Sequence, residues 1–368
     1  MQYLFIICVA FAFFFSGMLF SKKEKLTEDW LLGFIFSTIT FNTFYVFLCA
    51  KNSEEFYVPY FSEFIYALPL LYGPFTWLYT KAVTLTDFKL KKIEWLHFIP
   101  FVVFLVAITL PLWTSFQLPE NTQIGYPFFK LILTPFYIIA IIILIRRYNK
   151  IFLEEYSFEM EANLTWLNWI IGGAILVWII ATLSYIYNVA NPESTIFPSD
   201  YNTLTFLTLY LFILGIVAIR HTRLFSTQEA APAIKKVPLH TIIPEEPETI
   251  KEDFTTADLE KLEDAMQIKE AYLDPQLTLS KLAILTGIPA YRLSKVLKQK
   301  ESSFFDYVNG YRIEKVKSLL NEGKLAQLSM LGVATEAGFN SKASFNRVFK
   351  KATGITPSQY VKDTQGSD

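Results

Sequence analysis

The side chains best suited to a specific chemistry in this sequence are basic residues that gather near its C-terminal end. From residue 278 to residue 362 there are 14 Lys and Arg residues against five Asp and Glu residues, although the formal net charge of all 368 residues is only −1. A surface with this excess of positive charge attracts the phosphate backbone of nucleic acid. The alternative, an ordinary solvated surface, is less favoured because these residues lie within a repeated motif.

The elements that position these cations are predicted to be two helix–turn–helix motifs, at residues 278–300 and 328–351. Each copy has a small residue, a glycine four positions later and a bulky apolar residue directly after the glycine. The small residue lets two helices cross closely, and the glycine adopts the left-handed conformation that turns the chain. The second helix of such a motif enters the major groove of DNA. The residues concerned are Ala283, Gly287 and Ile288 in the first copy and Ala334, Gly338 and Phe339 in the second.

A single long helix is predicted between the two copies, over residues 303–320. Ser303 and Asp306 have the spacing of a capping box at its start. Phe304 and Val308 follow at helical spacing. The helix would therefore separate the two motifs.

Five runs of residues in this stretch together form a recognisable pattern. They are Leu-Ser-Lys-Leu-Ala (279–283), Phe-Phe-Asp-Tyr-Val-Asn (304–309), Tyr-Arg-Ile-Glu (311–314), Ala-Gly-Phe-Asn-Ser (337–341) and Phe-Asn-Arg-Val-Phe-Lys-Lys-Ala-Thr-Gly-Ile-Thr-Pro-Ser-Gln-Tyr (345–360). On these runs, of which the last is the most specific, the stretch resembles the DNA-binding domain of the AraC/XylS family of transcription regulators. The resemblance covers about the last 110 residues of the chain.

The resemblance implies which side chains face DNA. Those at positions that contact bases in that family are Tyr291, Ser294 and Lys295 in the first copy and Lys342, Asn346 and Arg347 in the second. The other candidate DNA-binding residues are Arg292, Lys298, Ser344, Lys350 and Lys351. The residues expected to face the core instead are Leu293, Val296, Phe345, Val348 and Phe349. For Lys295 and Arg347, a contact with phosphate alone is the alternative to a base contact.

The first 225 residues predict a different kind of domain. Hydrophobic residues make up 52% of the chain and charged residues 18%, whereas a soluble protein carries about 25% charged residues. Seven apolar stretches have about the length that crosses a bilayer. They lie near residues 2–20, 30–50, 61–82, 95–113, 126–145, 166–189 and 201–219. The expected fold is therefore all-α, with an N-terminal seven-transmembrane-helix bundle followed by an all-helical domain with two helix–turn–helix motifs.

Basic residues alternate between the loops of this predicted bundle. Lys and Arg gather after the first, third and fifth apolar stretches, whereas the alternate loops offer only Lys51. Under the positive-inside rule, this pattern predicts a multi-pass protein of the inner membrane with its N-terminus outside and its C-terminal domain in the cytoplasm. In a cell without a nucleus, that domain can reach DNA.

Few polar groups fall within the predicted spans. Glu63, Lys130, Asn188 and Asp200 all lie near outer ends of spans, where they form a candidate sensor pocket for a small or lipophilic signal. Ionisable groups within a membrane are costly and tend to be functional. Snorkelling to the outer surface, the favoured alternative, explains each of them without a ligand.

Three domains follow from these patterns: a transmembrane domain at 1–225, a Pro-rich linker at 226–250 and a DNA-binding domain at 251–368. No catalytic motif accompanies them. The three histidines, His97, His221 and His240, have no recognisable Ser or carboxylate partner, and the sequence contains no HExxH motif and no P-loop. No enzymatic activity, metal site or cofactor is therefore expected.

The sequence as a whole predicts a membrane-bound, sequence-specific DNA-binding transcription regulator whose membrane domain senses an unknown signal. Its expected partners are double-stranded DNA, the lipid bilayer, a small or lipophilic signal and a second copy of the chain in a homodimer. Two alternatives stay open. In one, the membrane domain is a passive anchor cut by a protease. In the other, the chain is a membrane receptor or transporter whose C-terminal domain binds protein partners.

Overall fold

The chain divides into two compact units, each described here by itself. Unit 1 comprises Met1–Arg146 and Leu164–Leu239, and unit 2 comprises Arg147–Asn163 and His240–Asp368. The structure is a computed structural model that describes residues 2–23, 26–51, 61–85, 88–113, 122–157, 165–191, 209, 210, 213, 255–300 and 302–365. The predicted linker at 226–250 lies outside these residues. Residues 147–163 belong to unit 2 although they precede the rest of it by many residues in the sequence.

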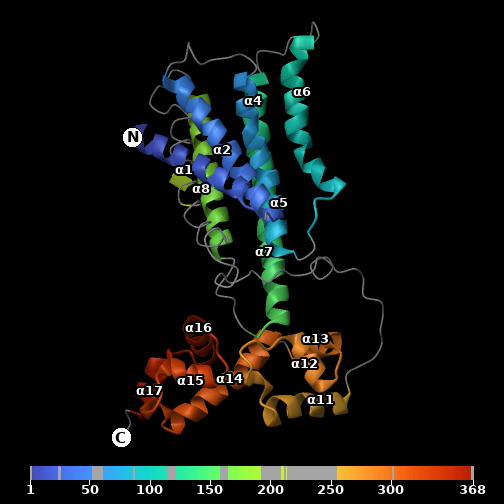
Figure 1. The fold of residues 1–368 in the computed structure, drawn as a ribbon, viewed down its shortest axis with the longest axis vertical. Helices are drawn as coiled ribbons and strands as arrows, with labels where there is room; N and C mark the ends of the chain where they lie inside the picture. Colours follow the sequence, from blue (N-terminus) through green and yellow to red (C-terminus); the bar gives the residue numbers. More distant parts are fainter. Residues whose placement is uncertain are drawn as a thin grey trace. The chain divides into compact units, whose positions relative to one another are not determined.

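Unit 1 is built from helices, beginning with α1 (Gln2–Ser21) and α2 (Thr27–Lys51), which pack against each other (Figure 1). The rings of Phe15 and Phe36 meet edge-on with centroids 4.8 Å apart, and both side chains are buried. The Ser16 hydroxyl donates a hydrogen bond to the Gly33 carbonyl at 3.1 Å. The further elements of this unit are α4 (Phe61–Ala67), η1 (Leu68–Leu71), α5 (Tyr72–Thr84), η2 (Lys92–Phe98), α6 (Ile99–Trp113), the first part of α7 (Thr122–Glu155) and α8 (Thr165–Ala190).

The predicted seven-transmembrane-helix bundle is contradicted. Among the residues described, none of the helices combines the length and the apolarity that crossing a bilayer requires. For two of the seven apolar stretches, the physical reason for the missing span is that the stretch is divided into shorter elements. Residues 61–82 are shared among α4, η1 and α5, with Pro69 at the start of η1. Residues 95–113 are shared between η2 and α6, whose 15 residues extend about 22 Å against a hydrocarbon core of about 30 Å.

The predicted inner-membrane, multi-pass localisation with an outside N-terminus depended on the same spans and is corrected with them. One of the basic clusters used to orient the bundle also differs from the prediction. Helix α7 continues beyond residue 145 through Arg146, Arg147 and Lys150 to Glu155. These cations therefore lie on a helix and not in a loop between two spans. The lipid bilayer was expected as a partner because of the same predicted spans, so this expectation is not supported either.

The candidate sensor pocket stays a prediction. Glu63, Lys130 and Asn188 lie on α4, α7 and α8. Their side chains fall outside the described part of the chain, as does all of Asp200.

Unit 2 contains both helix–turn–helix motifs and the end of α7. Several of its helices begin at side-chain caps: the hydroxyls of Thr278, Ser303, Ser329 and Ser341 each accept a hydrogen bond from a backbone N–H of the first turn. The elements are α11 (Thr256–Glu263), the π-helical turn η3 (Asp264–Ile268), η4 (Ala271–Leu273), α12 (Leu279–Thr286), α13 (Ala290–Gln299), α14 (Phe304–Asn321), η5 (Lys324–Ala326), α15 (Met330–Glu336), α16 (Lys342–Thr353) and α17 (Pro357–Gln365). The all-helical part of the predicted fold class is confirmed for the described residues, which contain no β-strand.

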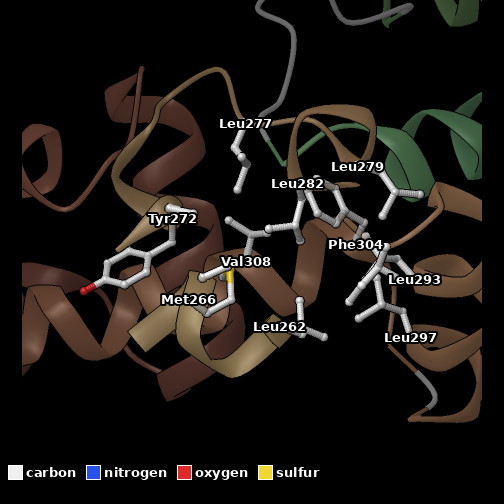
Figure 2. Packing of buried hydrophobic residues seen from close by; sticks show 13 residues of the cluster. Leu262, Met266, Tyr272, Leu277, Leu279, Leu282, Leu293, Leu297, Phe304 and Val308 are labelled. Atoms are coloured by element: carbon white, nitrogen blue, oxygen red, sulfur yellow. The ribbon is translucent and has the colours of Figure 1, made fainter. Parts of the chain in front are cut away.

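Helix α14 lies between two hydrophobic cores, and the predicted single helix between the motifs is thereby confirmed. Figure 2 shows the first core, in which Leu282 and Leu293 pack with Phe304. The second core joins Val316 of α14 to Phe345 of α16. We call residues 278–300 the first reader and residues 328–351 the second reader. Each reader therefore has its own core, and the two cores share one helix.

The turn glycines of both readers adopt the left-handed conformation that their spacing predicts, with φ of +68° at Gly287 and +89° at Gly338. Their surroundings differ. A Cβ atom at Gly287 would meet nothing within 4 Å, whereas one at Gly338 would lie 2.5 Å from the Tyr272 carbonyl oxygen and 2.9 Å from the Leu273 Cα. The turn of the second reader therefore fits closely against the backbone that precedes the first reader.

Replacing Gly338 by Ala should lower the free energy of unfolding of unit 2 by about 3 kcal/mol or more, because a backbone clash adds to the strain of a left-handed alanine. Gly287→Ala is the matched control, since it carries the same strain without the clash and should cost about 1–2 kcal/mol. Hydrogen exchange of the α14 amides measures both values. Equal losses in the two variants would contradict the close fit at Gly338.

Candidate nucleic-acid interface

The first reader presents one face of α13 to solvent. Leu293 and Val296 point into the core and are 1% and 3% exposed. Tyr291 and Lys295 are exposed, and Ser294 is half-buried. The predicted division of α13 into a core side and an outward side is confirmed for these buried residues.

The second reader has the same arrangement on α16. Phe345, Val348 and Phe349 are buried, again as predicted. The exposed residues among the candidates on this helix are Lys342, Asn346, Arg347, Lys350 and Lys351. Partial desolvation lowers the pKa of the Arg347 guanidinium from its usual value. The outward side of α16 thus carries an amide and several cations, which are the groups that recognise base edges and phosphates.

Four of the candidate DNA-binding residues already make contacts within unit 2. Ser344 is 3% exposed, and its backbone N–H donates at 3.2 Å to the hydroxyl of Ser341, which caps α16. The remaining three are cations that face carboxylates. The nitrogen–oxygen distances are 3.4 Å from Arg292 Nη2 to Asp258, 3.4 Å from Lys298 to Glu154 and 2.6 Å from Lys351 to Asp306.

The pair between Arg292 and Asp258 joins α13 to α11. Hydrogen bonds with the Thr255 backbone and hydroxyl hold the pKa of Asp258 below its usual value, and Arg292 adds a smaller effect in the same direction. Asp258 also completes a capping box with Thr255 at the start of α11. Arg292 therefore helps to fix the orientation of α13 in addition to any contact with DNA.

A buried arginine, Arg312 on α14, connects the parts of unit 2. It is 1% exposed. Its Nε donates to the Tyr272 carbonyl at 2.8 Å, Nη1 to the Ser157 carbonyl at 2.7 Å and Nη2 to the Asp274 carbonyl at 2.7 Å. Weaker bonds reach the Asn309 side chain at 3.2 Å and the Ser157 hydroxyl at 3.2 Å. Burial lowers the pKa of Arg312 to about 10, while the charge of Asp274 opposes that shift.

Arg312 also faces the second reader. Its guanidinium carbon lies 5.9 Å from the centroid of the Phe339 ring, at the distance of a cation–π contact. Phe339 is the apolar residue that follows the turn glycine of the second reader. The same guanidinium therefore contacts the second reader and the backbone that leads into the first.

Sequence reasoning missed two features of this interface. Arg312 was noticed only within the resemblance, although it shares a helical face with Val308 and Val316, and both of those residues are fully buried. The other feature is Ser157, which is 0% exposed and is held by bonds to residues more than 100 positions away. No local pattern in the sequence indicates that contact.

Residues 282–363 match a family model described as a helix-turn-helix domain. The match covers α13, α14 and α16, and it supports the predicted DNA-binding domain of AraC type and a role as a DNA-binding transcription regulator. The predicted fusion to a membrane domain has no such support. No curated protein and no solved structure matches the chain.

Replacing Arg312 by Met should lower the free energy of unfolding of unit 2 by about 3–5 kcal/mol, because the Tyr272 carbonyl loses its donor and the carbonyls of Ser157 and Asp274 each lose one of two donors. Lys350→Met likewise replaces a cation by Met, on the exposed face of α16, where a surface substitution costs about 0.5 kcal/mol or less. Hydrogen exchange of the α14 amides compares the two variants. A similar small loss in both would mean that Arg312 does not hold the unit together.

Proposed function

We propose that the chain is a sequence-specific transcription regulator that reads double-stranded DNA with α13 and α16. One observation carries the proposal: in both helices the apolar side is buried in the unit's own core, and the opposite side presents polar and basic residues. A helix–turn–helix motif uses its second helix in this way, with the outward side chains at base edges and phosphates. The helix-turn-helix match over residues 282–363 supports the same function.

The outward side chains suggest a division of roles. Asn346 and Arg347 are able to make paired hydrogen bonds with adenine and guanine in the major groove. Lys342 and Lys350 are compact charges suited to phosphates, which position the protein without reading sequence. The proposed specificity therefore resides chiefly in Asn346 and Arg347 of α16, with Tyr291, Ser294 and Lys295 as the candidates on α13.

Arg347→Ala should cost about 1–3 kcal/mol of binding free energy on a duplex selected by the intact chain from a random library, because a bidentate base contact is lost. The same change should cost much less on a random duplex of equal length. Fluorescence anisotropy titrations of the two duplexes give the difference.

Lys350→Ala is the matched control, since it removes one neighbouring positive charge from α16. It should weaken binding to both duplexes alike and reduce the dependence on salt concentration by about one counterion. Should Arg347→Ala also weaken both duplexes equally, the base contact assigned to Arg347 is wrong. A chain that binds no duplex at all would favour the alternative in which the C-terminal domain binds protein partners.

The two readers should contact successive major-groove segments about 34 Å apart on one face of the duplex, since they share α14. Inserting about five base pairs between the two contacted segments should abolish the specific gain in affinity, because it rotates one segment to the opposite face. An inserted duplex that keeps full affinity would show that only one reader makes specific contacts. Control by a signal molecule and pairing of two chains stay predictions.

A further inference from the structure

The end of α7 and the two residues after it, 147–157, form part of unit 2, and we call them the docking segment. Its anchor is Ser157, which is 0% exposed. The Ser157 hydroxyl donates to the Leu277 carbonyl at 2.7 Å, and its own carbonyl accepts from Arg312 at 2.7 Å and from Asn309 at 3.0 Å. Every polar group of this anchor residue is thus bonded within the unit, because its backbone N–H also donates to Leu277.

The docking segment places two carboxylates on the first reader. The Glu155 carboxylate accepts from the Ser280 hydroxyl at 2.7 Å and lies 3.4 Å from the Ser280 backbone nitrogen. Ser280 stands in the first turn of α12. The Glu154 carboxylate lies 3.4 Å from the Lys298 ammonium group in the last turn of α13. Two negative charges therefore sit at the two helices that make up the first reader.

These positions are the ones that DNA phosphates would occupy. In a helix–turn–helix complex the first helix crosses the DNA backbone, and backbone N–H groups at a helix N-terminus bind phosphate oxygens. Lys298 was itself predicted to contact DNA. A groove of about 290 Å³ next to it is lined by Leu153 and Glu154 on one side and by Ser294 and Lys298 on the other. The docking segment thus shares the predicted DNA face with two candidate DNA-binding residues.

Ser157 and the two carboxylates differ in how easily a DNA phosphate could displace them. The anchor is buried, but the pair of Lys298 and Glu154 is open to water, with side chains 61% and 29% exposed. An exposed ion pair is worth only about 0.2–1 kcal/mol, so a DNA phosphate is able to replace one of its members. The anchor would therefore stay in place while the two carboxylates compete with the DNA backbone.

We propose that Glu154 and Glu155 act as intramolecular substitutes for DNA phosphates, and that the docking segment lowers the affinity of the first reader for DNA. This inference rests on the proposed function. It assigns a regulatory role to residues that precede the first reader by more than 100 positions and lie outside the matched helix-turn-helix region. Anything that withdraws the two carboxylates from the first reader would raise its affinity for DNA without altering α13 itself.

The test compares two double variants of the full chain on the selected duplex. Glu154→Gln with Glu155→Gln removes the two charges and keeps the shape and one acceptor oxygen on each side chain. Glu314→Gln with Glu322→Gln is the matched control, because it changes the net charge equally at two exposed residues, one on α14 and one directly after it. We expect the first variant to bind about fivefold or more tightly than the control. Its affinity should also depend more steeply on salt, by about one counterion, because Lys298 becomes available to phosphate.

Adding Lys298→Met to the first variant should remove most of the gain, and hydrogen exchange of the α14 amides checks that each variant is folded. Equal affinities of the two double variants would overturn the inference, while the effect of Arg347→Ala on the selected duplex would still support the proposed function. Failure of the wild-type chain and of every folded variant to bind any duplex would overturn both.

Discussion

Unit 2 depends on the burial of one positive charge. An unpaired guanidinium in a core is very costly, so Arg312 is tolerated only where several acceptors surround it. The acceptors come from three separated parts of the chain: Ser157 after α7, the segment from Tyr272 to Asp274, and Asn309 on α14 itself. If any of these parts moved away, the buried guanidinium would lose hydrogen-bond acceptors. The geometry of both readers follows from this convergence.

The arrangement also explains why two small motifs hold together as one unit. Each reader has a core of its own, and each core uses a different set of residues on α14. Two cores on one helix would be joined only by that helix if nothing else connected them. Arg312 near Phe339 and the backbone contact at Gly338 supply the further connection. A DNA site read by both helices benefits from such rigidity, because less conformational entropy is lost on binding.

The local features of unit 2 were predictable from sequence because they depend on neighbours in the chain. The resemblance implied that Leu293 and Phe345 are core residues, and the two turn glycines were identified from the residues around them. The long-range features were not predictable, since Ser157 and Leu277 are 120 positions apart. The membrane prediction failed for a related reason. A run of apolar residues indicates burial but does not say what buries it, and it takes no account of helix ends such as the one near Pro69.

The two readers share one sequence pattern, yet their turn glycines differ in how much space surrounds them. The turn at Gly287 faces open space and would accept the turn of the other copy, whereas the turn at Gly338 is pressed against the Tyr272 carbonyl. A Cβ atom at Gly287 meets only the strain of the left-handed backbone, while one at Gly338 also meets the backbone of Tyr272 and Leu273. Selection for new DNA sites is thus freer to remodel the first turn than the second.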